Sequence, residues 1–241
     1  MDKYKQSIYE NYISTHNKTL YGENSLDKVR AYFPVQNRYY GPHLPKNKDA
    51  AILEIGCGDG GGVYWLHSLG YKNTQGIDYS GEQVDKGKSM GIPNLECADL
   101  NVYLSENKTQ YDLIIAKDVI EHFTRDEVFD IMRLVCKNLK PGGHFMMQVP
   151  NGQGLFYSSV FYGDYTHEMA YTPNSVNQVI LNTGFKSSRC YPTGPVPKGF
   201  VATIRYLLWM YKVATLRFWK MVETGSSKGI FTQNIIAVIE K

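Results

Sequence analysis

Glycines and acidic residues recur in this sequence at the points where apolar runs end. Gly56 and Gly58 follow the run 51–55, and three more glycines (60–62) precede an apolar stretch over 63–69. A strand, a glycine turn and a helix in this order are typical of nucleotide-binding α/β proteins, because glycine lets the backbone bend sharply and a ligand come close. The free N–H groups at a helix start also attract a negatively charged group. The stretch therefore predicts a site for a nucleotide-like cofactor.

Acidic residues narrow the choice of cofactor. Asp78 ends the next predicted strand, about 20 residues after the first glycine, where a carboxylate can accept from both ribose hydroxyls. This spacing also fits NAD. Three further acids favour another cofactor: Glu54 before the first glycine, Asp99 after the third predicted strand and Asp118 after the fourth. A dehydrogenase would also need a catalytic group such as a Tyr-x-x-x-Lys pair, and no tyrosine has a lysine four residues on.

Alternating strand and helix patterns position these residues. Short apolar runs predict strands over 51–55, 73–78, 94–98, 111–116, 144–149, 185–191 and 230–239. Helical patterns cover 61–69, 81–90, 125–139, 173–183 and 200–222. We therefore expect an α/β fold with a doubly wound, mostly parallel seven-stranded sheet. Residues 1–30 also look helical, whereas 31–50 and 151–172 are predicted to be loop.

Five motifs within residues 50–150 together resemble the class I S-adenosylmethionine-dependent methyltransferases. They are Leu53–Gly60, Gly76–Ser80, Ala98–Leu100, Asp112–His122 and Leu139–Gly143. The run Asp164–Val176, with Gly184-Phe185 after it, looks like the small-molecule and glycan O-methyltransferase branch of that family. The resemblance implies a Rossmann-like methyltransferase fold and S-adenosylmethionine as the cofactor.

The same resemblance implies a set of cofactor-binding residues. They are Glu54, Gly56, Cys57, Gly58, Asp78, Tyr79, Asp99, Leu100, Lys117 and Asp118. The glycine backbone would cradle the methionine part, and Asp78 would hold the ribose hydroxyls with Tyr79 against the adenine. Asp99 and the Leu100 backbone would read the adenine edge. Lys117 and Asp118 would lie where the methionine end and the acceptor meet.

Two histidines are the candidate general bases. Methyl transfer from a sulfonium needs the nucleophile about 3 Å from the methyl group and then the removal of a proton. An alcohol needs a base or a metal for this, whereas an amine needs little. His122 and His167 both follow strands at the carboxyl edge of the sheet, and Asp164 is the third candidate catalytic residue. The alternative for His122 is packing against the cofactor.

A metal ion is the alternative to a base. Asp118, Glu121 and His122 fall at i, i+3 and i+4, so one helical turn could point them the same way. With His167 they would form a mixed oxygen and nitrogen site for Mg or Mn. The small-RNA 2′-O-methyltransferases bind Mg with a similar acid-x-x-Glu-His set, and this chain resembles them only in that pattern. The first member here is the shorter aspartate.

The predicted helix over 200–220 is basic and aromatic. Four cations fall within an arc of about 140° on its helical wheel, namely Arg205, Lys212, Arg217 and Lys220. Trp209 and Trp219 stand among the apolar residues of the remaining wheel. Such a helix suits a membrane interface or a lipid-linked substrate. The alternative is packing on the sheet or on a second subunit of a homodimer.

Composition and segment boundaries complete the expectations. The net charge of +3 is too small to indicate a nucleic-acid partner, and the four cysteines include no Cys-x-x-Cys pair. With neither a signal peptide nor an apolar run of roughly 18 residues, the expected location is the cytoplasm, with peripheral contact on the inner membrane face as an option. Residues 1–50 are expected to form a helical and loop lid. Residues 51–241 would form the methyltransferase domain, with an insertion at 193–228.

The expected acceptor is a hydroxyl of a saccharide, for example a nucleotide-sugar, a capsular or O-antigen polysaccharide, or a lipid-linked glycan. The tyrosines and tryptophans outside the core suit sugar stacking and hydroxyl hydrogen bonding. A quinone precursor or another small molecule with an oxygen or nitrogen nucleophile is the first alternative. A non-catalytic cofactor-binding scaffold is the second, and the intact glycines and acids argue against it.

Overall fold

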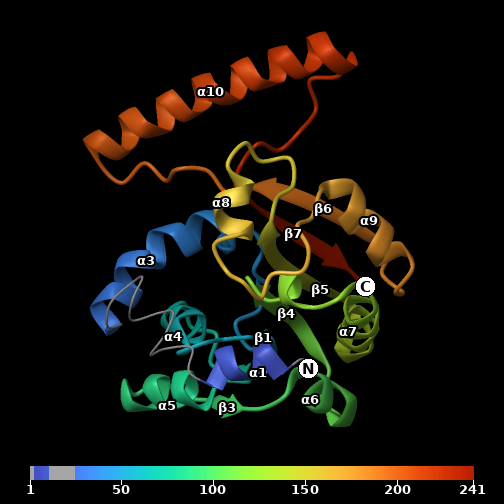
Figure 1. Ribbon diagram of the computed structural model, residues 1–241. Helices are drawn as coiled ribbons and strands as arrows, with labels where there is room; N and C mark the ends of the chain where they lie inside the picture. Colours follow the sequence, from blue (N-terminus) through green and yellow to red (C-terminus); the bar gives the residue numbers. More distant parts are fainter. Residues whose placement is uncertain (1–2, 11–24) are drawn as a thin grey trace.

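The computed structural model describes residues 3–10 and 25–241, and these form the expected α/β architecture (Figure 1). Its sheet has seven strands in the order β3-β2-β1-β4-β5-β7-β6. The strands are β1 (Ile52–Ile55), β2 (Thr74–Asp78), β3 (Leu95–Cys97), β4 (Tyr111–Lys117), β5 (Leu139–Pro150), β6 (Ser187–Pro192) and β7 (Asn234–Glu240). Strands β1 to β5 pair in parallel, whereas β7 runs antiparallel to both β5 and β6. The prediction of a mostly parallel seven-stranded sheet is confirmed.

Helices cover both faces of this sheet. They are α1 (Lys3–Glu10), α3 (Leu26–Tyr39), α4 (Gly61–Ser68), α5 (Gly81–Ser89), α6 (Leu100–Glu106), α7 (Arg125–Asn138), α8 (Tyr157–Phe161), α9 (Pro173–Leu181) and α10 (Phe200–Thr224), with 3-10 turns η2 (Gly41–His43) and η3 (Ile120–His122). Successive strand residues point to opposite faces. Leu53 and its partner Ile114 therefore pack with α7 and α9, whereas Ile52 and its partner Leu113 pack with α4. Two apolar layers result, one on each face.

The prediction of loop over 31–50 is wrong in its first part, because α3 continues to Tyr39. Pro34 lies inside this helix and removes one helical N–H donor. Packing against α4 compensates, since the indole N–H of Trp65 donates to Asn37 Oδ1 at 2.8 Å. Tertiary contacts here outweigh the local sequence preference.

Helix α6 was also missed by the sequence analysis. Its N-cap is Asp99, whose Oδ1 accepts from the backbone N–H of Asn101 at 2.9 Å and of Val102 at 3.1 Å. The helix has only seven residues, too few for a clear periodic signal. It follows β3 directly and so places residues 99–101 at the edge of the sheet.

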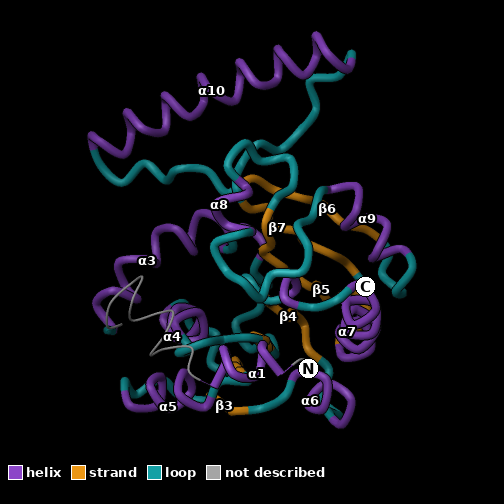
Figure 2. Tube along the Cα trace, viewed as in Figure 1, coloured by secondary structure: helices purple, strands orange, loops and turns teal. Residues whose placement is uncertain are grey.

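Helix α10 stands apart from the sheet (Figures 1 and 2). It has 25 residues, and none of them is buried. Loop segments on both sides join it to β6 and β7 (Figure 2). The expected alternative in which this helix packs on the sheet is therefore wrong. Among the helices of residues 3–10 and 25–241, none has the length and apolar character that crossing a membrane requires.

Candidate active site

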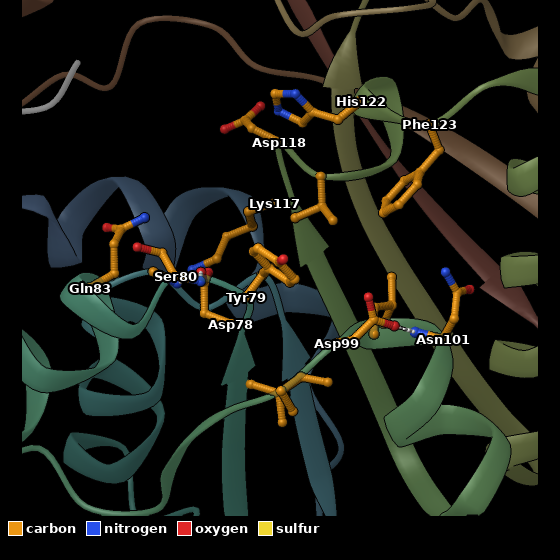
Figure 3. Close-up of a pocket in the computed structure, with 16 residues that line it drawn as sticks. Asp78, Tyr79, Ser80, Gln83, Asp99, Asn101, Lys117, Asp118, His122 and Phe123 are labelled. Carbon is orange, nitrogen blue, oxygen red and sulfur yellow. Dashed lines mark hydrogen bonds between the residues drawn. The ribbon is translucent and has the colours of Figure 1, made fainter. Parts of the chain in front are cut away.

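A pocket of about 300 Å³ opens at the carboxyl ends of β1, β2 and β4 (Figure 3). Its lining residues are Gly56, Gly58, Ile77, Asp78, Tyr79, Ser80, Gln83, Ala98, Asp99, Leu100, Asn101, Lys117, Asp118, Val119, His122 and Phe123. Strand order reverses between β1 and β4, and open α/β sheets bind ligands at such a switch point. The pocket has the size and position of a cofactor site.

The glycine turn after β1 forms one wall of this pocket. Gly56 has φ +63°, and a Cβ added there would lie 2.3 Å from Val119 Cγ2, so only glycine fits. The Cys57 side chain is buried in an apolar cluster with Val63 and Val84 and does not line the pocket. Burial raises the pKa of its thiol far above the usual range. Cys57 can therefore contribute only its backbone to a cofactor site.

Asp78 ties the glycine turn to the end of β2. Its Oδ2 accepts from the Gly58 N–H at 2.7 Å, and its Oδ1 accepts from the Ser80 N–H at 2.8 Å. Burial raises the pKa of this carboxyl, although the two N–H groups oppose the shift. Tyr79 lies next to it with its side chain in the pocket (Figure 3). Asp78, the predicted ribose-binding residue, thus lies in the pocket and also fixes the glycine turn to the end of β2.

Asp99 also has a structural role. Its Oδ1 caps α6 through the Asn101 and Val102 N–H groups, and the first of these bonds is drawn in Figure 3. The second carboxylate oxygen remains as the acceptor that the sequence analysis assigned to the adenine edge. Leu100 lines the pocket as expected. Asn101 and Phe123 line it too, and no motif in the sequence pointed to either.

Glu54 does not line the pocket but forms an ion pair with Lys117, which does. Glu54 Oε1 lies 2.6 Å from Lys117 Nζ, and the Glu54 side chain is only 1% exposed. Its second oxygen, Oε2, is buried and has no hydrogen-bond partner among the described residues. A Cβ added at Gly62 would lie 2.3 Å from both Glu54 Oε1 and Lys117 Nζ. Gly62 therefore allows α4 to start directly over this pair.

Asp118 lies at the rim of the pocket. Its φ of +56° is left-handed, a conformation that aspartate tolerates better than most residues. Its carboxylate accepts from Gln148 Nε2 at 2.8 and 3.0 Å and from Asn234 Nδ2 at 3.5 Å. The sequence analysis named neither amide, because β5 and β7 come next to β4 only in the folded sheet.

His122 belongs to a hydrogen-bonded chain at the pocket. Its Nδ1 lies 2.7 Å from Thr166 Oγ1, and that hydroxyl donates to Asp164 Oδ1 at 2.6 Å. Because the hydroxyl proton goes to Asp164, the Thr166 oxygen can accept from His122 Nδ1–H. Burial lowers the pKa of His122 to about 4, helped by His167 and opposed by Asp164 and by a hydrogen bond from the ring to the Asp118 backbone. His122 is therefore neutral at pH 7.

Asp164 is the ionised end of that chain. Burial disfavours its charge, but hydrogen bonds from the Thr166 hydroxyl and N–H outweigh burial and lower the pKa of its carboxyl. The sequence analysis named His122 and Asp164 as candidates but not Thr166, which is fully buried between them. A lone threonine in a loop carries no signal for this role.

His167 contacts His122 but does not line the pocket. Its side chain is 7% exposed, and its Nδ1–H donates to the Phe161 carbonyl at 2.9 Å. Its Nε2 is 4.0 Å from Glu121 Oε1, and the rings of His122 and His167 are 4.6 Å apart. The two candidate bases thus meet, but only His122 reaches the pocket.

Glu121, His122 and His167 form the cluster that could hold a metal ion. One ligand atom from each lies within 4.8 Å of the others. Both Glu121 oxygens are buried with no hydrogen-bond partner in the described part of the chain, and burial raises the pKa of this carboxyl well above its usual value. The structure does not bring Asp118 into the cluster, because residues 120–122 form a 3-10 turn rather than the expected α-helical turn.

Helix α1 lies against this part of the site. Lys5 Nζ donates to the His122 carbonyl at 2.6 Å and pairs with Glu168 Oε1 at 2.8 Å. The Tyr4 hydroxyl also donates to Glu168, at 3.0 Å. The predicted lid role of residues 1–50 stays a prediction, and positions 11–24 of the predicted lid lie outside the described residues.

Comparisons with known proteins agree with the fold. A family model described as a methyltransferase domain matches residues 30–186. The structure is similar to a SAM-dependent methyltransferase from Archaeoglobus fulgidus, with a TM-score of 0.67 and 17% identity over 100% of both chains. It is also similar to an S-adenosylmethionine-dependent methyltransferase from Mesorhizobium loti, with a TM-score of 0.59, 15% identity, and coverage of 86% of this chain and 98% of that one.

Two further matches cover less of the other protein. Phosphoethanolamine N-methyltransferase 2 of Haemonchus contortus, solved with S-adenosyl-L-methionine, has a TM-score of 0.58 and 15% identity, over 97% of this chain and 60% of that one. An uncharacterised protein of Rickettsia prowazekii is 26% identical over 141 residues. That match spans 51% of this chain but only 25% of the Rickettsia protein.

Proposed function

The chain belongs to the methyltransferase-domain family, a family of enzymes, and from that membership we propose that it transfers the methyl group of S-adenosylmethionine to a saccharide hydroxyl. The class predicted from the sequence motifs is confirmed by the family match. The glycan O-methyltransferase branch stays a prediction. One observation carries the choice of oxygen over nitrogen, namely the chain from Asp164 through Thr166 to a neutral His122 at the pocket.

We assign the cofactor to the pocket at the glycine turn. The adenosine part would lie against Tyr79, with Asp78 accepting from the ribose and the Asp99 Oδ2 accepting from the adenine amino group. The methionine part would lie along the Gly56 and Gly58 backbone, near Lys117. A pocket of about 300 Å³ is at the lower end of the range for ligands of this kind.

The proposed step uses His122 as the general base. As the acceptor oxygen bonds to the methyl carbon, the sulfur–carbon bond breaks and S-adenosylhomocysteine leaves as a neutral thioether. The acceptor hydroxyl loses its proton to the His122 ring. The imidazolium that forms is stabilised through Thr166 by the ionised Asp164. An amine acceptor would need no such chain.

Labelled S-adenosylmethionine with a panel of acceptors tests this proposal. We expect methylation of a saccharide hydroxyl, loss of turnover in His122→Gln, and normal turnover in the control His144→Gln on β5. Methylation of a catechol alone would favour the quinone-precursor alternative, and methylation of amines alone would overturn the oxygen acceptor. Absence of cofactor binding by calorimetry would remove the cofactor assignment.

A divalent metal is the second candidate, because a buried carboxylate with no hydrogen-bond partner among the described residues faces two histidines. Glu121 and His167 Nε2 would bind Mg or Mn, and His122 Nε2 would be the third ligand in place of its role as base. The metal would then lower the pKa of a bound acceptor hydroxyl. Chelator-treated protein distinguishes the two mechanisms, since full activity without metal leaves His122 as the base.

We propose that α10 lies on a lipid surface. Its exposed apolar side chains span roughly 180° of the helical wheel, and none of that half is charged. They are Phe200, Val201, Ile204, Leu207, Leu208, Met210, Tyr211, Phe218, Trp219, Met221 and Val222. Lys212 and Arg217 border this half on either side, so the charged residues of the helix lie outside it.

Co-sedimentation with phosphatidylglycerol vesicles at low salt tests the lipid contact. We expect wild-type protein in the pellet and Leu207→Glu/Phe218→Glu in the supernatant, because two charges would enter the apolar half. Full recovery of wild-type protein in the supernatant would overturn the contact. A stable dimer by analytical ultracentrifugation, lost in the same variant, would favour the second copy that the sequence analysis left open.

A further inference from the structure

A second cavity, of about 650 Å³, lies between α3, the first half of α10 and the segments that join α10 to the sheet. Figure 1 shows α10 crossing the molecule above α3 and α8. Gln148 and Asn234 line this cavity, and both donate to Asp118 at the rim of the cofactor pocket. A molecule bound in the second cavity could therefore extend one end to the proposed methyl-transfer site.

The lining of the second cavity is positively charged. Lys198, Arg205 and Lys212 line it, and its described lining includes no aspartate or glutamate. Within residues 3–10 and 25–241, no carboxylate forms an ion pair with Arg205 or Lys212. Lys198 Nζ donates to the Ala31 carbonyl at 3.0 Å, and Lys212 Nζ lies 4.8 Å from the centre of the Phe156 ring. Cations in a concave site whose described lining holds no carboxylate attract an anion.

Aromatic rings supply much of the remaining lining. They are Tyr32, Tyr39, Phe156, Trp209 and Phe231. Trp209 packs closely over Gly194, where an added Cβ would lie 2.8 Å from the indole. Flat aromatic faces pack against the apolar faces of rings, and a tyrosine hydroxyl can bond a sugar hydroxyl. The lining thus combines anion binding with ring binding.

We propose that this second cavity is the acceptor site and that the acceptor carries a phosphate or diphosphate. Arg205 and Lys212 are seven residues apart on α10, so they lie on one face of the helix, about two turns apart. Their charge-assisted hydrogen bonds would hold the phosphate groups, and the guanidinium fork of Arg205 suits phosphate oxygens. The ring of the acceptor would lie against Trp209, with its hydroxyl directed to Asp118 and His122.

This assignment rests on the proposed methyl transfer and names the substrate class for it. A nucleotide-sugar and a lipid-linked sugar share the same chemistry here, since each carries a diphosphate. A lipid-linked acceptor would have its chain near the exposed apolar half of α10, whereas a nucleotide-sugar would stay within the cavity.

Calorimetry on the full chain saturated with S-adenosylhomocysteine tests the site. The probes are pyrophosphate, UDP-glucose, farnesyl diphosphate in micelles, and glucose as the phosphate-free control. We expect pyrophosphate to bind, and Arg205→Gln/Lys212→Gln to weaken its binding about tenfold or more. Arg217→Gln is the matched control, because it removes a cation from the same helix outside the cavity and should leave the affinity unchanged. Lys212→Gln alone covers the case in which the double variant is unstable.

The outcomes test the acceptor site independently of the proposed methyltransferase function. Binding of UDP-glucose or of farnesyl diphosphate, lost in the double variant, supports the site and identifies which source of diphosphate it takes. Failure of all three phosphate probes, or an equal loss in Arg217→Gln, overturns it. S-adenosylhomocysteine binding is measured in the same samples, so the methyltransferase proposal stands or fails separately.

Discussion

Glu54 and Lys117 form an ion pair of 2.6 Å across neighbouring parallel strands, with the Glu54 side chain almost fully buried. Lys117 lines the pocket and Glu54 does not, so the pair joins a buried residue of β1 to the wall of the pocket. Its first consequence concerns stability. Lys117→Met would leave the Glu54 charge buried without its partner, at a cost of about 3 kcal/mol in the free energy of unfolding.

Urea denaturation measures that cost, and a double-mutant cycle assigns it to the pair. Glu54→Gln/Lys117→Met should recover part of the loss, because it removes both charges. Strictly additive losses in the cycle would show that the two residues do not interact. Lys140→Met, which breaks the half-exposed pair with Asp112, is the matched comparison and should cost no more than about 1 kcal/mol.

Replacing Gly62 or its neighbour Gly61 by alanine should have opposite effects on stability. A Cβ at Gly62 would lie 2.3 Å from Glu54 Oε1, whereas at Gly61 the nearest atom would be 3.5 Å away. Gly62→Ala should displace the ion pair and destabilise the fold by roughly 1–3 kcal/mol. Gly61→Ala should be neutral or stabilising by up to about 1 kcal/mol, because alanine favours the helix. Equal melting temperatures for the two variants would contradict the close packing of α4 on the pair.

The activity of the enzyme should persist at acid pH. The base must be neutral, and burial lowers the pKa of His122 to about 4, below the ordinary value of 6.5. The acid limb of kcat/KM should therefore have its midpoint well below pH 6.5. The same shift means that His122 contributes stability above pH 6.5 that is lost as the pH falls toward 4. A midpoint at 6.5 or above would argue against His122 as the base.

Thr166→Val should reduce turnover without weakening cofactor binding. The variant keeps the shape of the side chain but breaks the link from His122 to Asp164. We expect kcat to fall about 10²-fold, within the range for a general base that loses its support, while the Kd for S-adenosylhomocysteine stays unchanged. Tyr165→Phe is the control, since its exposed ring adjoins Thr166 in the same segment. An unchanged kcat in Thr166→Val would exclude the chain from catalysis.

Glu121→Gln should stabilise the protein at alkaline pH. Burial raises the folded-state pKa of this carboxyl, so the folded state holds a proton that the unfolded chain loses above its ordinary value near 4.5. Stability therefore falls as pH rises from there, by about 1.4 kcal/mol per pH unit until the folded pKa is reached. The glutamine variant lacks this slope. A slope that Glu121→Gln leaves unchanged would mean that another group causes it.

The same variant tests the metal cluster. If Mn raises the melting temperature of the wild type, Glu121→Gln should abolish that shift, because it removes the charged ligand. Glu168→Gln, which alters an exposed carboxylate near the cluster, should retain it. A shift that both variants keep would place the metal elsewhere.

The sequence by itself determined the sheet and one half of the site. Strand lengths, glycine turns and the acids at strand ends are local features, and parallel strands bring their carboxyl ends to one edge. Local patterns alone therefore assigned Gly56, Gly58, Asp78 and Asp99 to one pocket, and all four line it. Two helices did not follow from these patterns: α3 continues through Pro34 because it packs on α4, and α6 is too short for a periodic signal.

Only the tertiary structure shows which residues come together around the proposed acceptor site. The hydrogen bonds from His122 through Thr166 to Asp164 join distant parts of the sequence, since His122 and Thr166 are 44 positions apart. The second cavity gathers side chains from α3, α10 and the segment before β7, which no sequence spacing relates. Helix periodicity separated the charged and apolar sides of α10, but it did not show which side faces the rest of the protein. Long-range packing sets such arrangements, because they depend on how distant elements dock rather than on neighbouring residues.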